Sequence, residues 1–233
     1  MNDLIGRVYR FEQQIFPDQS ALFNQLTTEG QRPTALMISC ADSHVVPEQI
    51  MQAAPGDLFV SRNAGNIVPP FSQTVGGVTA TVEYAVAVLK VTDIIVCGHS
   101  DCGAMKALSK PGSTDGLPSV AAWLRHASAA EKVVNDSYPQ LDEAERVRAI
   151  SLENVVTQLA HLRTHPAVAA AVARGELALH GWFVDIHVGQ VLGLDGESGR
   201  FSVLREGENL PIAQRAAQRR AADFVPAYAV AAE

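Results

Sequence analysis

Short apolar runs alternate with longer amphipathic segments along most of the chain. Six runs are too short for typical helices and are bounded by turn-forming residues. They occupy residues 34–39, 58–61, 93–97, 179–188, 190–195 and 200–204. Buried strands of parallel sheets commonly show runs of this kind between helical segments. The pattern therefore predicts strands at all six places, the last three being joined by Gly-containing turns.

Apolar residues at helical spacing mark the segments between these runs. The expected helices cover residues 2–29, 74–90, 117–130, 141–164 and 166–174. Pro17 should break the first of them, because proline lacks the N–H that a helix interior requires. Pro166 fits a helix start, and Gly175 fits a helix stop. The chain is thus expected to be α/β, with a mainly parallel central sheet and surrounding helices, and ligands should bind beyond the carboxyl ends of strands.

The composition is that of an ordinary globular protein. The 233 residues are 47% hydrophobic and 18% charged, which fits a single domain over residues 1–233. The formal net charge of −7 argues against binding to nucleic acid or to an anionic membrane surface. The segment after Pro211 is rich in Ala and Arg and is expected to form a helix without an assigned function.

Cysteine content indicates a reducing compartment. The chain holds three cysteines. Such a small and odd number argues against a disulfide framework. We find no N-terminal stretch with the features of a signal peptide. Apolar runs stay below the roughly 20 residues needed to span a bilayer. We therefore expect a cytoplasmic protein.

Metal-binding side chains follow two of the predicted strands. Cys40 ends the run at 34–39, while His99 and Cys102 follow the run at 93–97. Two cysteines and a histidine are usual zinc ligands that leave one coordination position. Water in that position gives a source of hydroxide near neutral pH, whereas a fourth protein ligand gives a structural site. Cys97 lies inside an apolar run and is expected to be a small buried residue.

Asp42, two residues after Cys40, has two alternative roles at such a site. It could complete a Cys₂HisAsp tetrahedron, which would close the site. It could instead orient a zinc-bound water without touching the metal. An Asp in a turn rich in Ser and His also commonly serves as a turn residue. The residues alone leave these alternatives open.

Three motifs give the chain a resemblance to the β-class carbonic anhydrases, and several of its expected pocket positions resemble the plant-type branch of that family. The family's Cys-x-Asp-x-Arg segment is matched from Cys40 except at one position, where His44 replaces Arg. The later His-x-x-Cys-Gly segment is matched from His99. Between them, residues 62–66 resemble the family's Arg-Asn-x-x-Asn segment. Residues 179–195 are also similar to the family's late strands, so the resemblance implies a β-carbonic anhydrase-like fold.

The resemblance implies zinc as cofactor, held by Cys40, His99 and Cys102, and reversible hydration of carbon dioxide to bicarbonate. Asp42 would orient the water or be the fourth ligand of a closed state. The other implied site residues line the substrate pocket or stabilise bicarbonate: Gln31, Phe59, Ala64, Tyr84 and Gly103. Gln31 and a backbone N–H near Gly103 would bind the new negative charge.

The resemblance also implies a homodimer or a larger oligomer built from dimers. In the family, the pocket is shared across a dimer interface. Residues 1–30 would form a helical arm that packs on a neighbouring subunit. The protein would be free in the cytoplasm or packed within a carbon-fixing compartment.

His44 departs from the family at the arginine that normally forms a two-pronged pair with Asp42. Arginine is planar, bidentate and always charged, unlike a neutral histidine. Three outcomes follow. His44 could donate one hydrogen bond to Asp42 and preserve activity, and it could also shuttle a proton. Asp42 could bind zinc, leaving a low-activity homologue with a binding role. The site could instead serve as a carbonyl sulfide or carbon disulfide hydrolase.

Overall fold

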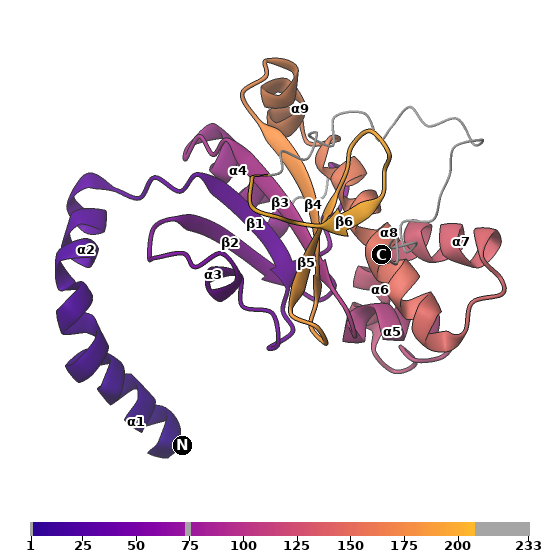
Figure 1. Ribbon diagram of the computed structural model, residues 1–233, viewed down its shortest axis with the longest axis horizontal. Coiled ribbons are helices and arrows are strands. Elements are labelled where there is room, and N and C mark those ends of the chain that lie inside the picture. The colour runs from indigo at the N-terminus through magenta and orange to yellow at the C-terminus, as the bar shows by residue number, and fades with distance from the viewer. Residues whose placement is uncertain (1, 73–75, 208–233) are drawn as a thin grey trace.

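The fold is built around a six-stranded sheet in the order β2-β1-β3-β4-β5-β6 (Figure 1). A computed structural model describes residues 2–72 and 76–207. Its strands are β1 Ala35–Cys40, β2 Leu58–Asn63, β3 Asp93–His99, β4 Ala178–Asp185, β5 Gln190–Leu194 and β6 Phe201–Val203. The strands from β2 to β4 run parallel, whereas β5 and β6 extend one edge in antiparallel fashion. The mainly parallel sheet expected from the sequence is confirmed.

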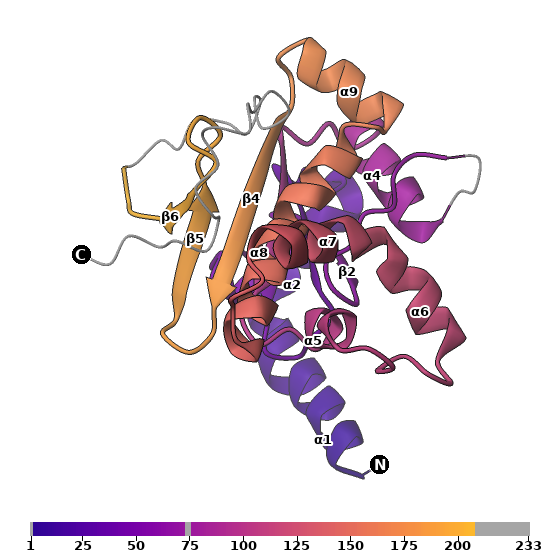
Figure 2. The same cartoon turned by 90° about the vertical axis from the view of Figure 1, so that its right-hand side faces the viewer.

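Most helices pack around the sheet, and the N-terminal helices extend away from it. Those described are α1 Asn2–Arg10, α2 Phe16–Glu29, α3 Pro47–Ile50, α4 Gly77–Ala87, α5 Gly103–Ser109, α6 Pro118–Leu124, α7 Ser128–Ser137, α8 Glu143–Leu162 and α9 Pro166–Ala173. Helix α8 lies against β3 and β4, and α5 and α7 pack on α8 (Figure 2). This layer places α5 and α8 beside the carboxyl end of β3.

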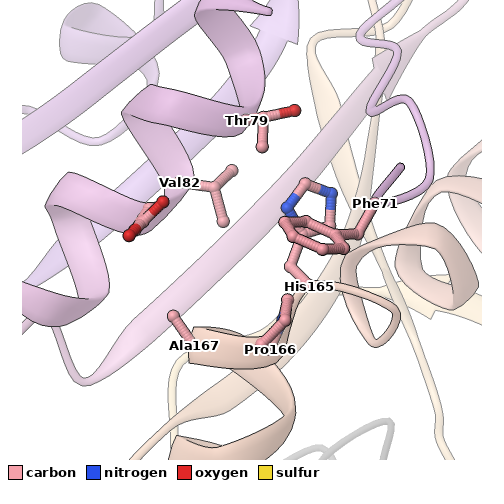
Figure 3. Close-up of a pocket in the computed structure, with 7 residues that line it drawn as sticks. Phe71, Thr79, Val82, His165, Pro166 and Ala167 are labelled. Atoms are coloured by element: carbon pink, nitrogen blue, oxygen red, sulfur yellow. The ribbon is translucent and has the colours of Figure 1, made fainter. Parts of the chain in front are cut away.

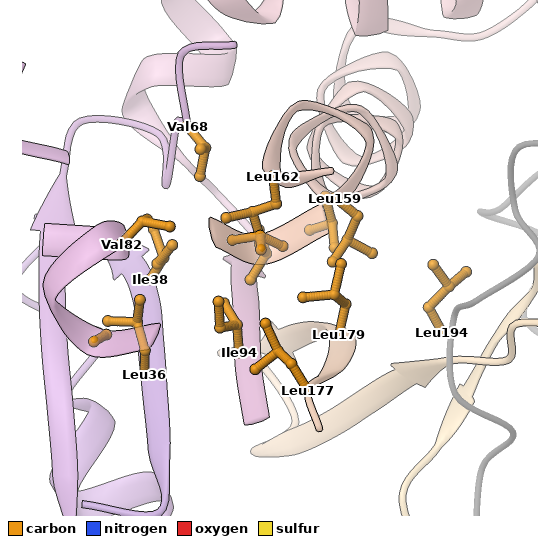
Figure 4. Packing of buried hydrophobic residues seen from close by; sticks show 14 of the residues in the cluster. Leu36, Ile38, Val68, Val82, Ile94, Leu159, Leu162, Leu177, Leu179 and Leu194 are labelled. Carbon is orange, nitrogen blue, oxygen red and sulfur yellow. The ribbon is translucent and has the colours of Figure 1, made fainter. Parts of the chain in front are cut away.

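The main core lies between the sheet and the helices α4, α8 and α9. Leu36 and Ile38 of β1 lie beside Val82 of α4, and Leu159 and Leu162 of α8 belong to the same cluster (Figure 4). Alternate residues of a strand face opposite sides of a sheet, so the intervening residues of β1 bury themselves on the other face. A smaller cluster there includes Met37, Cys97 and Trp182. Burial on both faces explains why β1 and β3 read as continuous apolar runs.

Two strand glycines allow α8 to approach the sheet closely. A Cβ atom at Gly98 would lie 2.8 Å from Val155 Cγ2, and one at Gly181 would lie 2.9 Å from Val155 Cγ1. Both distances are shorter than carbon atoms tolerate. Glycine at these positions therefore sets the separation between α8 and the strands β3 and β4.

The N-terminal helices project from the body of the subunit (Figure 1). Their apolar side chains are largely exposed, with Leu4 at 61% and Val8 at 57%. A π-helical stretch, Phe11–Ile15, separates α1 from α2, and Pro17 lies in the first turn of α2. The interruption expected at Pro17 therefore lies just before it, where the proline's missing N–H requires no partner.

Several boundaries differ from those expected. The strands β2 and β3 run two residues further, because Asn63 and His99 still pair with their neighbours. The segment expected as one helix over 117–130 is divided into α6, a 3₁₀ turn and α7. The short helices α3 and α5 were not predicted. The helix expected after Pro211 lies outside the described residues. None of the described helices has the length and apolar character that crossing a membrane requires.

Candidate metal centre

The ends of two adjacent strands bring the predicted metal ligands together. Cys40 is the last residue of β1 and His99 is the last residue of β3, its parallel neighbour. Cys102 is the residue that immediately precedes α5. The three donor atoms lie within 4.8 Å of one another, and the two sulfur atoms are 3.9 Å apart. All three side chains are buried. Residues up to 62 positions apart in sequence thus form one compact group.

The His99 ring is oriented so that one nitrogen is left for a metal. Its Nδ1 atom lies 2.8 Å from the Ser100 carbonyl oxygen, which can only accept, so Nδ1 carries the proton. Its Nε2 atom is buried and has no hydrogen-bond partner among the described residues. Histidine ligands of metals typically use one nitrogen in this way while the other donates to a carbonyl. The buried Nε2 and the two sulfur atoms fit zinc.

The pKa values of the two ligand cysteines are shifted in opposite directions. The pKa of Cys40 is lowered to about 4, chiefly because the Cys102 thiol donates to the Cys40 sulfur. The same hydrogen bond, together with burial, raises the pKa of Cys102. Cys97 behaves differently, since burial raises its pKa to about 12. The prediction of Cys97 as a small buried residue is confirmed.

Backbone groups of the loop after β2 support the Cys40 sulfur. The Gly65 N–H donates to Cys40 Sγ at 3.3 Å. Gly65 has a φ of +82°, and a Cβ atom there would lie 2.9 Å from Met105 Cε. Arg62 donates from Nε to the Cys40 carbonyl at 3.0 Å and from Nη2 to the Asp42 carbonyl at 2.6 Å. The loop therefore fixes the sulfur, and the Arg62 side chain of β2 fixes the backbone of the first ligand segment.

Asp42 is held by His44 rather than grouped with the three donors. Asp42 Oδ1 accepts from the His44 backbone N–H at 3.0 Å and lies 2.7 Å from His44 Nδ1. The backbone bond is the main reason that the pKa of Asp42 is lowered. Asp42 is not a member of the close donor group found among the described residues. The hydrogen bond from His44 to Asp42 is the contact that the first of the three outcomes requires, and the choice among the three stays a prediction.

The expected pocket residues divide into two sets. Ala64 directly precedes Gly65, and Gly103 directly follows Cys102, so both adjoin the donor group. Phe59 and Tyr84 form a ring pair with centroids 5.9 Å apart, but Phe59 pairs with Leu36, four residues before Cys40. At a rise of about 3.3 Å per residue, this pair lies roughly 13 Å along the strand from Cys40.

Gln31 belongs with the second set. It is exposed and precedes β1, so it lies at the opposite end of that strand from Cys40. Tyr84 is 46% exposed. One chain thus places Gln31, Phe59 and Tyr84 away from its own donor group.

Sequence reasoning missed two residues that hold the metal loop. Trp123 Nε1 donates to the Ala64 carbonyl at 2.8 Å, and Asn154 Nδ2 donates to the Gly65 carbonyl at 2.9 Å. Asn154 is fully buried on α8, directly before the buried Val155. A buried amide in that position was the available signal, because such groups need hydrogen-bond partners. Nothing around Trp123 in the sequence marks its role.

A separate cavity of about 110 Å³ lies between α4 and the start of α9 (Figure 3). Phe71 and His165 lie beside each other in its wall, with ring centroids 5.9 Å apart. His165 Nε2 lies 3.0 Å from the Pro69 carbonyl, which explains the orientation of the ring. None of the predicted site residues lines this cavity.

Comparison with known proteins agrees with the geometry. Residues 35–191 match the family model described as carbonic anhydrase. The chain is 53% identical to a carbonic anhydrase of Pseudomonas aeruginosa, over 88% of this chain and 93% of the relative. It is 49% identical to carbonic anhydrase 1 of Escherichia coli O157:H7, over 86% and 91%.

Solved structures show the same similarity. The β-carbonic anhydrase CcaA matches with a TM-score of 0.86 and 43% identity, covering 90% of this chain and 94% of that one. A tetrameric β-carbonic anhydrase of Sordaria macrospora matches with a TM-score of 0.69 and 34% identity, covering 83% and 93%.

Proposed function

Because the chain belongs to the β-carbonic anhydrase family and is a zinc-using carbonate dehydratase, we propose that Cys40, His99 and Cys102 hold the zinc for carbon dioxide hydration. The observation that carries this assignment is the buried His99 Nε2, unpartnered among the described residues, beside two sulfur atoms. Zinc held by these residues would supply a source of hydroxide near neutral pH.

We assign Asp42 the role of orienting the attacking water through a hydrogen bond. Its carboxylate is fixed by His44 at Oδ1, and the His44 backbone N–H keeps it ionised. Held in this way, Asp42 acts as an acceptor and stays off the metal. His44, exposed beside this carboxylate, is placed to pass a proton to solvent.

The complete substrate pocket is proposed to form between two copies of the chain. One copy supplies the donor group with Ala64 and Gly103, and the other supplies Gln31, Phe59 and Tyr84. The separation of roughly 13 Å between Phe59 and Cys40 within one chain supports this division. The apolar rings would hold carbon dioxide, while Gln31 and the Gly103 backbone N–H would stabilise bicarbonate.

The projecting N-terminal arm is proposed to pack on the second copy. Its exposed apolar residues include Leu4, Val8 and Phe11. Large contiguous apolar surfaces of this kind usually mark protein interfaces. A homodimer, or a larger oligomer built from it, would bury them. The cytoplasmic location expected from the sequence stays a prediction.

Cysteine substitutions test the ligand assignment. Cys40→Ser should lose zinc, measured by atomic absorption, and carbon dioxide hydration, measured by stopped flow. Cys97→Ser is the matched control, since Cys97 lies on a neighbouring strand outside the donor group. Full zinc content in Cys40→Ser would refute the assignment. Zinc-loaded native protein that hydrolyses carbonyl sulfide but does not hydrate carbon dioxide would contradict the proposed substrate.

A further inference from the structure

The peptide that joins Ala64 to Gly65 has both of its polar atoms engaged. Its N–H, belonging to Gly65, donates to Cys40 Sγ at 3.3 Å. Its C=O, belonging to Ala64, accepts from Trp123 Nε1 at 2.8 Å. One amide therefore connects the Trp123 indole to the sulfur of the first proposed ligand.

The following peptide is fixed from the other side of the loop. Gly65 C=O accepts from Asn154 Nδ2 at 2.9 Å, and Asn154 Oδ1 accepts from Gln158 Nε2 at 2.8 Å. Gln158 Oε1 in turn accepts from the Val68 N–H at 2.9 Å. All of these side chains are buried on α8. The loop thus has little freedom to turn, so the direction of the Gly65 N–H is set by side chains of two helices.

Hydrogen bonds in a chain polarise one another, particularly where water is scarce. A donor on the Ala64 carbonyl makes the Gly65 N–H a stronger donor. A stronger N–H bond draws charge from the Cys40 thiolate and fixes the position of its lone pairs. Outer partners of this kind tune metal ligands without touching the metal.

We propose that Trp123 is a positioning residue of the metal centre, which sets the donor strength of Cys40 through the Ala64–Gly65 peptide. The inference rests on the ligand set given under the proposed function. Trp123 is half-buried on α6, where its ring meets His126 edge-on at 5.9 Å. That contact holds the indole in place while its N–H faces the loop.

The test compares cobalt-substituted proteins, because thiolate-to-cobalt charge-transfer absorption reports the sulfur directly and needs no activity assay. In one variant, Trp123 is replaced by β-(3-benzothienyl)alanine, which keeps the ring shape but lacks the N–H. In a second, Trp123→Phe, the N–H and part of the ring are lost. Trp182→Phe is the control, since Trp182 packs in the cluster on the other face of the sheet.

Both Trp123 variants should shift the charge-transfer band to lower energy, because the thiolate regains charge. Their zinc affinity, measured by chelator competition, should nevertheless fall about tenfold, because the Cys40 lone pairs are no longer fixed in direction. The Trp182→Phe band should stay at the native position. Circular dichroism spectra identify any variant that fails to fold, and the benzothienyl variant then decides the outcome.

A native-like band in the benzothienyl variant would overturn the proposal, even if Trp123→Phe differs, because packing alone would then explain the effect. If native protein binds cobalt without any thiolate band, the ligand set of the proposed function fails, and this inference fails with it. If the native protein shows the thiolate band and the band does not shift when the indole N–H is lost, only the role proposed for Trp123 is overturned.

Discussion

Asp42 Oδ1 accepts two hydrogen bonds from His44, one from the backbone at 3.0 Å and one from ring Nδ1 at 2.7 Å. Only one of the two bonds depends on the side chain of residue 44. The His44 ring is 70% exposed, so its bond competes with water. The backbone bond persists whatever side chain stands at position 44. The carboxylate is therefore held in part by the turn itself.

His44→Ala should accordingly reduce carbon dioxide hydration without abolishing it. The ring bond is lost while the backbone bond remains, so we expect kcat/KM to fall by about tenfold, as for other outer partners of metal sites. His44→Arg should restore or raise the native value, because a guanidinium can hold a carboxylate at two points. Zinc content should be unchanged in both. Stopped-flow rates equal to native in both variants would show that the side chain has no role.

Gly65→Ala should damage the metal centre more than a methyl group usually does. The new Cβ would lie 2.9 Å from Met105 Cε and 3.1 Å from Ala104 Cβ, at a φ of +82° that disfavours side chains. The end of the Met105 side chain can shift, but Ala104 Cβ and the positive φ leave relief to a movement of the loop, which turns the Gly65 N–H away from Cys40. We expect zinc affinity to fall at least about tenfold by chelator competition. Gly77→Ala is the control, since a Cβ there meets nothing within 4 Å.

Gly181→Ala should destabilise the fold by about 1–3 kcal/mol, the usual effect of overpacking. The added Cβ would lie 2.9 Å from Val155 Cγ1 and 3.0 Å from Leu159 Cδ1, so α8 must move away from β4. Urea denaturation measures the change. A free energy of unfolding equal to native would mean that α8 can shift without loss.

Asp142→Ala should lower the free energy of unfolding by about 1 kcal/mol, because it removes the N-terminal cap of α8. Asp142 Oδ1 accepts from the Glu145 N–H at 2.9 Å, and alanine offers no acceptor in its place, whereas Glu145 Oε2 can still accept from the backbone N–H of residue 142. Asp136→Ala is the control, since it breaks only an exposed pair with Lys132. Equal denaturation curves for the two variants would contradict this role of the cap.

Thiol chemistry of the zinc-free protein should separate Cys40 from Cys97. The Cys40 pKa of about 4 means that its thiolate is present throughout the range from pH 6 to 8. The Cys97 pKa of about 12 means that its thiolate is scarce there. Iodoacetamide followed by mass spectrometry should therefore label Cys40 first, with little dependence on pH, and zinc should protect it. Preferential labelling of Cys97 would be incompatible with these environments.

Local patterns were sufficient for the strands and for the metal ligands. The runs ending near Cys40 and Cys97 could be predicted as strands because both faces of β1 and β3 are buried, which gives continuous apolar sequences. The ligands could be predicted from their types and from the rule that parallel strand ends meet. Exact ends were missed where polar or small residues, such as Asn63 and Gly98, continue a ladder after the apolar run stops.

The supports of the metal loop could not be predicted in this way. Trp123 and Ala64 are 59 residues apart, and Asn154 and Gly65 are 89 apart. Such contacts depend on how α6 and α8 pack relative to the sheet, and the spacing of residues within a segment does not predict that packing. The same holds for the distance between Phe59 and Cys40, which follows only from the register of β1 with β2.

The position of Phe59 far along the strand from Cys40 has a consequence for mixtures of defective proteins. Cys40→Ser removes the metal-binding half of the proposed pocket, and a double variant, Gln31→Ala with Tyr84→Ala, removes the two exposed side chains of the other half. Either variant alone should be inactive or nearly so, since each site in its homodimer lacks one half. When equal amounts are unfolded and refolded together, random pairing makes about half of the dimers mixed, and each mixed dimer regains one intact site of its two. Roughly a quarter of the native activity should therefore reappear from two proteins that each have almost none.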